Sequence, residues 1–190
     1  MYTVGEEAWA AALCALFEDE YVFVAVGPRG GGAWEEDALA VMGREVADPR
    51  GWAGQDWDED STERTSSRPG FPFTPGSAEE IARKLRDIDA GTAVRLLVAL
   101  ADDWCRITKV PGFSGNPEGL LTQARDALSR FGPHFSCYTN VAEARVPKSP
   151  RRMVDESGPG WTPLTEYTAD YGLVVVSGSE VGVFWSFNPI

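Results

Sequence analysis

The side chains best suited to nucleophilic chemistry are the single histidine, His134, and a cysteine three positions later, Cys137. A thiolate beside an imidazole is a common nucleophile and base pair. We predict a strand over residues 135–141, however, and side chains three positions apart on a strand point to opposite faces. His134 could still serve a serine triad, although the chain has no Gly-x-Ser-x-Gly elbow. The sequence therefore assigns no catalytic residue.

The carboxylates offer oxygen ligands but no complete metal motif. A run of acids, Asp56-Trp-Asp-Glu-Asp60, and the pair Asp102-Asp103 could bind Mg²⁺ or Ca²⁺. The run lacks the glycine and the terminal glutamate of a calcium loop, and the three cysteines lack the spacing of a zinc site. We therefore predict neither a metal nor a cofactor, and we interpret the acidic run as a solvated surface.

A glycine-rich stretch, Gly27-Pro-Arg-Gly-Gly-Gly32, follows a predicted strand at residues 20–26. Backbone amides of such a loop can bind phosphate when a helix begins directly after it. The Gly-Lys-Ser/Thr ending of a phosphate loop is absent, and the next residues, Glu35-Glu36-Asp37, would repel an anion. We interpret the stretch as a connection between elements.

The remaining candidate is a long acidic and aromatic excursion at residues 47–76, which has neither a helical nor a strand period. Excursions of this length in a compact domain are usually functional or disordered, and the aromatic residues argue against disorder. Either the aromatics pack onto the body, or they anchor a partner that the carboxylates attract. The predicted binding residues are Trp52, Asp56, Trp57, Asp58, Glu59 and Asp60.

Composition limits the class of partner. The chain has 190 residues, 43% of them apolar, which predicts one folded domain spanning residues 1–190. Its net charge of −12 disfavours nucleic acids and anionic membranes and favours a basic protein partner. An odd number of widely spaced cysteines, with neither a signal peptide nor an apolar run of membrane length, predicts a reduced, soluble, cytoplasmic protein.

The predicted fold is α+β, with a mainly antiparallel sheet of five or six strands and three main helices packed on it. The clearest element is a C-terminal hairpin, in which a continuous apolar run at 173–176 is followed by a strictly alternating strand at 181–187. Residues 92–100 fit either a helix or a strand; we favour a strand, with a return strand at 104–110, because Gly91 ends the preceding helix. The three helices are predicted at 3–18, 77–90 and 117–131.

Three functions fit these observations. The first is a binding module that neutralises a basic partner, as small immunity proteins and antitoxins do. The second is an enzyme that uses carboxylates and tyrosines in a pocket between sheet and helices. The third is an assembly subunit whose hairpin edge, at 181–187, pairs with a neighbour, although the sequence does not give the oligomeric state. The residues to test for the enzyme are Arg95, Glu166, Tyr167, Asp170 and Tyr171.

Overall fold

The computed structural model describes residues 5–17, 21–52, 55–56, 64–65, 67–142, 144 and 160–188. Six strands form one sheet in the order β2-β1-β6-β5-β4-β3, and every neighbouring pair is antiparallel. The strands are β1 (Val22–Pro28), β2 (Gln55–Asp56), β3 (Arg86–Ile88), β4 (Ser136–Thr139), β5 (Ala169–Val176) and β6 (Glu180–Asn188). The helices are α1 (Glu6–Leu16), α2 (Trp34–Met42), α3 (Ala78–Lys84), α4 (Ala90–Ala99) and α5 (Pro117–Ser129). The α+β fold is confirmed.

The predicted hairpin is confirmed, and it lies at the centre of the sheet. Val176 pairs with Val181 beside the turn, and β6 is hydrogen-bonded to β5 on one side and to β1 on the other. Every residue of β5 and β6 is buried. For β5 this confirms the burial on both faces that its continuous apolar run predicted. Because both sides of β6 are already paired, the predicted assembly through its edge is wrong.

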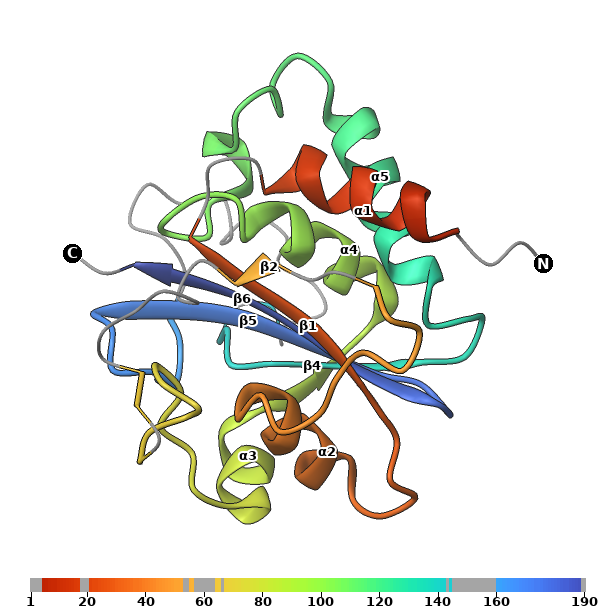
Figure 1. The fold of residues 1–190 in the computed structure, drawn as a ribbon. Coiled ribbons are helices and arrows are strands. Elements are labelled where there is room, and N and C mark those ends of the chain that lie inside the picture. The colour runs from red at the N-terminus through yellow and green to blue at the C-terminus, as the bar shows by residue number, and fades with distance from the viewer. Residues whose placement is uncertain are drawn as a thin grey trace.

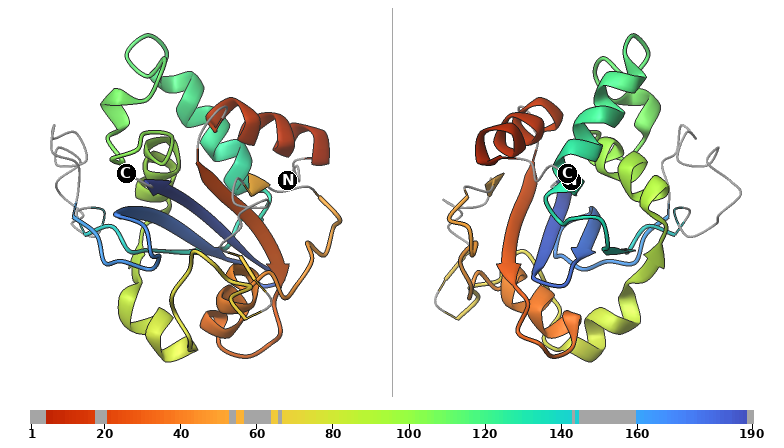
Figure 2. Two further views of the ribbon diagram at one scale, coloured as in Figure 1. Left: turned by 60° about the vertical axis from the view of Figure 1, so that its left-hand side comes forward. Right: turned by 90° about the vertical axis from the view of Figure 1, so that its right-hand side faces the viewer.

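Helices cover both faces of the sheet, as Figure 1 shows. One face packs against α1, α4 and α5, and the other against α2 and α3. Figure 2 shows the same separation from two further directions, with the red and teal helices above the strands and the orange and yellow-green helices below. The alternation of β6 assigns Val183 and Trp185 to the α2 side and Phe184 to the other side. No helix of the described residues has the length and apolar character needed to cross a membrane.

Two predicted helix starts are confirmed by their caps. At α3, the backbone amide of Glu80 donates to Ser77 Oγ at 3.3 Å, and the Glu80 carboxylate accepts from the Gly76 amide at 3.1 Å. At α5, Asn116 Oδ1 accepts from the Gly119 amide at 3.0 Å. The predicted N-terminal helix corresponds to α1, which begins at Glu6 with Gly5 as its N-cap.

The structure differs from the prediction over part of residues 77–110. The predicted helix 77–90 ends at Lys84, and the predicted strand 92–100 is helix α4. Asp89 begins this new helix, since its carboxylate accepts from the Thr92 amide at 2.9 Å and from the Thr92 hydroxyl at 2.7 Å. Gly91 therefore lies in the first turn of α4 and does not end a helix. The predicted return strand at 104–110 is a turn with a short 3₁₀ helix, Ile107–Lys109.

Candidate functional site

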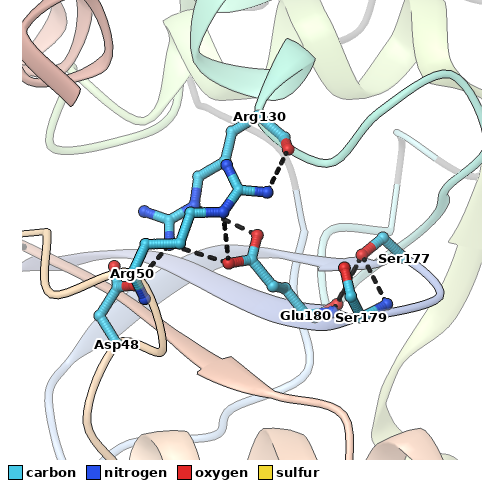
Figure 3. Close-up of polar contacts among 6 residues, drawn as sticks. All are labelled: Asp48, Arg50, Arg130, Ser177, Ser179 and Glu180. Carbon is cyan, nitrogen blue, oxygen red and sulfur yellow. Dashed lines mark hydrogen bonds and ion pairs between the residues drawn. The ribbon is translucent and has the colours of Figure 1, made fainter. Parts of the chain in front are cut away.

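A buried guanidinium lies where the end of α5, the first residue of β6 and the start of the excursion meet. Arg130 directly follows α5, and its side chain is 0% exposed. Its Nη2 donates to Asp48 Oδ1 at 2.6 Å and to Glu180 Oε1 at 3.1 Å, while its Nε donates to Glu180 Oε2 at 3.3 Å (Figure 3). The Glu180 side chain is 3% exposed, so this ion pair is shielded from solvent on both sides.

A second arginine completes the charge balance of this site. Arg50 Nε lies 3.2 Å from Glu180 Oε1, and Arg50 Nη2 donates to the Arg130 carbonyl oxygen at 3.3 Å (Figure 3). The site therefore joins two guanidinium groups to two carboxylates, those of Asp48 and Glu180. We call these four residues the Arg130 cluster. Because burying a charge is costly unless it is paired and hydrogen-bonded, the cluster holds its members in one arrangement.

Two indoles enclose the guanidinium. Arg130 Cζ lies 4.5 Å from the ring centroid of Trp9 and 4.3 Å from that of Trp52. Arg50 Cζ lies 5.1 Å from the Trp52 centroid, and the two indole centroids are 5.5 Å apart. The half-buried ring of Trp52 thus already contacts two cations. The Trp52 indole fixes residues 48–52 to the body. Of the two roles considered for this residue, the structure therefore favours packing onto the body over anchoring a partner.

The other end of the excursion is also packed onto the body. Phe71 is buried, and the ring of Phe73 contacts those of Phe23, Trp185 and Phe187. The Thr74 amide donates to the Leu164 carbonyl oxygen at 2.8 Å. The excursion is therefore anchored on both sides of residues 53–66.

The remaining predicted binding residues lie between these anchors. Asp56 belongs to β2, where it pairs with Phe23 of β1. Trp57, Asp58, Glu59 and Asp60 are outside the described residues. Their role in binding stays a prediction.

The structure separates the predicted enzyme residues. Asp170 accepts hydrogen bonds from the amides of Leu164 and Thr165, the Thr165 hydroxyl, the Asn140 side-chain amide and the Trp185 indole. Burial raises the pKa of this carboxyl group against the effect of these donors. With its acceptor positions filled, Asp170 links residues 164–165 to Asn140, which directly follows β4, and to Trp185 of β6. Its geometry is that of a structural anchor.

The other enzyme candidates do not converge on Asp170. Tyr171 contributes to the core on the α1, α4 and α5 side, whereas Asp170 bonds to Trp185 on the α2 side. Glu166 forms an ion pair with Arg68, and the Tyr167 ring packs against Phe71 and Phe187. Arg95 is exposed on α4. These contacts place the predicted catalytic groups in separate environments.

His134 and Cys137 occupy different environments. His134 is exposed and lines a shallow hollow of about 470 Å³ together with Arg29, Ser136 and Ser177. Cys137 is buried, and desolvation raises its thiol pKa to about 12. A thiol with this pKa is not a nucleophile near neutral pH, so the structure supports no thiolate–imidazole pair here.

The glycine-rich stretch is hydrogen-bonded to a carboxylate of the protein itself, that of Asp37. Arg29 Nε donates to Asp37 Oδ2 at 2.7 Å, and the Gly30 amide donates to Asp37 Oδ1 at 3.0 Å. The Asp37 carboxylate thus occupies donors that a phosphate would need. Among the described residues, no group of three or more His, Cys, Asp or Glu side chains could hold a metal ion.

No family model, curated protein or solved structure matches the chain. The function must therefore be inferred from its own charges and contacts.

Proposed function

We propose that this protein is an acidic binding module that sequesters a basic protein partner and neutralises it, in the manner of an immunity protein or an antitoxin. The observation that carries the proposal is the unequal pairing of charges. Several basic side chains are held in internal ion pairs, including those that join Arg29 to Asp37, Arg68 to Glu166, Lys84 to Glu80 and Arg106 to Asp102.

Many carboxylates, in contrast, face solvent without a basic partner. No ion pair joins a described basic residue to these exposed acids: Glu6, Glu7, Glu36, Glu45, Asp87 and Asp126. With a net charge of −12, the excess of negative charge is available to attract a cationic surface. Such complementarity speeds association with a basic partner and selects against acidic ones.

The two anchors of the excursion support the same proposal. Residues 48–52 are fixed by the Arg130 cluster, and residues 71–74 by core packing. The sequence between these anchors contains Asp56, Asp58, Glu59, Asp60 and Glu63. Both ends of the stretch that carries these acids are therefore held on the body, which supports its use as a contact surface.

The test uses the protein as bait in extract from its native host, followed by titration of the purified partner. A basic protein should bind, and its Kd should rise as salt is increased. A variant with Trp57→Ala, Asp56→Asn, Asp58→Asn and Glu59→Gln should bind at least about tenfold more weakly. The control carries Glu6→Gln, Glu7→Gln and Asp126→Asn, which removes the same number of charges from other exposed sites. An acidic partner, or a Kd independent of salt, would contradict the proposal.

A further inference from the structure

Two aromatic rings form a half-exposed stack on the α2 side of the sheet. Trp34, the first residue of α2, lies over Tyr138 of β4, with 4.0 Å between ring centroids and 15° between ring planes. Both side chains are half-buried. Within the described residues no guanidinium or ammonium group lies over either ring, in contrast to Trp52. No described cation therefore covers the rings of this stack, whereas the ring of Trp52 already contacts Arg50 and Arg130.

Three carboxylates belong to residues that neighbour the stack in the sheet or in the sequence. Asp87 of the edge strand β3 is the register partner of Tyr138, so the two side chains project from the same face of the sheet. Glu35 and Glu36 follow Trp34 in the first turn of α2. None of these three acids forms an ion pair with a described basic residue. We call Trp34, Glu35, Glu36, Asp87 and Tyr138 the α2–β4 surface.

The neighbouring cations do not cancel this negative charge completely. Arg29 is paired with Asp37, and Lys84 is paired with Glu80. Arg86 directs its guanidinium to the carbonyl oxygens of its own preceding turn, at residues 82–85. The unpaired carboxylates and the electron-rich ring faces are thus both suited to a cation.

We infer that the α2–β4 surface is a docking site for an arginine- or lysine-bearing segment of the basic partner. The cationic side chain would lie against the Trp34–Tyr138 stack, with its charge balanced by Asp87 and the two glutamates. This inference rests on the proposed function and deepens it, because it gives the partner an aromatic anchor on the described body. Trp and Tyr are the residue types most often found at such anchors.

The first experiment measures binding of a fluorescent oligoarginine peptide by anisotropy at low and moderate salt. A surface variant carries Glu35→Gln, Glu36→Gln and Asp87→Asn. The matched control carries Glu6→Gln, Glu7→Gln and Asp126→Asn, which also removes two glutamates from a first helical turn and one exposed aspartate, but on the opposite face. We expect about tenfold weaker binding for the surface variant and less than about twofold for the control.

The second experiment tests the rings. Trp34→Leu should weaken peptide binding at least about fivefold, whereas Trp34→Phe should recover most of it, because phenylalanine keeps an aromatic face. Circular dichroism and urea unfolding establish that each variant is folded, and a folded Tyr138→Leu variant provides a second measurement if Trp34→Leu is unstable.

The outcomes separate the two proposals. Equal weakening by the surface and control variants, or no effect of the ring variants, would overturn the α2–β4 site while leaving a basic partner possible through the excursion. If the unaltered protein fails to bind oligoarginine at low salt, the proposed preference for basic partners is itself contradicted. Selective loss in the surface and ring variants supports the site.

Discussion

Arg130 and Glu180 form a buried ion pair between residues 50 positions apart in the sequence, with Nη2 3.1 Å from Oε1. The pair connects the end of α5 to the first residue of the central strand β6. Arg50 and Asp48 join the same pair and thereby attach the start of the excursion. The Arg130 cluster thus joins a helix, a strand and a loop.

Replacing Glu180 with glutamine should therefore destabilise the fold strongly. Arg130 would keep only Asp48 as a counter-charge, and Arg50 would lose its carboxylate. We expect the free energy of unfolding to fall by about 3 kcal/mol or more, measured by urea denaturation. The control is Glu118→Gln, since the Glu118 side chain is 80% exposed and lies 3.8 Å from Arg125. It should change stability by less than about 0.5 kcal/mol, and equal effects of the two substitutions would contradict the importance of the buried pair.

Gly172 should tolerate no side chain. A Cβ atom at this position of β5 would overlap the indole of Trp185 on the neighbouring strand. Gly172→Ala should lower the free energy of unfolding by about 2–3 kcal/mol or more, because the indole is packed in the core and cannot move aside. Gly178→Ala, in the turn of the same hairpin, meets nothing within 4 Å and should cost less than about 1 kcal/mol. Thermal unfolding of the two variants checks this difference.

The three cysteines should react at very different rates. Cys14 is exposed, whereas Cys105 and Cys137 are buried. At about pH 8, an aromatic disulfide reagent should modify one thiol rapidly and the other two only as the protein unfolds, because burial blocks access and raises the pKa of Cys137 to about 12. Cys14→Ser should abolish the rapid phase. A rapid phase that persists in this variant would show that the core opens around a buried thiol.

Asp170→Asn should give a pH-dependent loss of stability. Burial raises the folded-state pKa of Asp170, so the folded protein holds this proton to a higher pH than the unfolded chain does. The stability contributed by proton binding is complete below the unfolded-state pKa, about 4, and falls as the pH rises toward the folded-state value. Asparagine does not titrate, so the difference in unfolding free energy between wild type and variant should shrink as the pH rises above about 4.

Urea denaturation at a series of pH values measures this difference. Asp126→Asn, on the exposed face of α5, serves as a control for the loss of one aspartate. A gap between wild type and Asp170→Asn that widens with pH would mean that the hydrogen bonds to the carboxylate outweigh its desolvation.

Local patterns in the sequence predicted most of the fold. The alternation of β6 identified its two faces, and the continuous run in β5 predicted burial on both sides. The caps at Ser77 and Asn116 each join residues within one helical turn, so the local sequence was sufficient to predict where these helices begin. The error at α4 has the same local origin, because Asp89, two residues before Gly91, forms a cap with Thr92, one residue after it.

The Arg130 cluster was not predicted. Nothing in the sequence links Arg130 to Glu180, because their contact depends on how α5 packs against the sheet. The indication available was an arginine within the apolar pattern that ends α5, directly before Phe131, but its partners become evident only in the folded arrangement.

The strand order also constrains how this chain can fold during synthesis. The hairpin that fills the middle of the sheet is translated after every other strand, and β1 emerges from the ribosome long before its neighbour β6. Until β6 is available, β1 has only the two-residue strand β2 beside it, and its apolar residues lack their central partner. Pairing of β1 with β6 therefore waits until residues 180–188 have been synthesised, and until then one edge of β1 is unpaired.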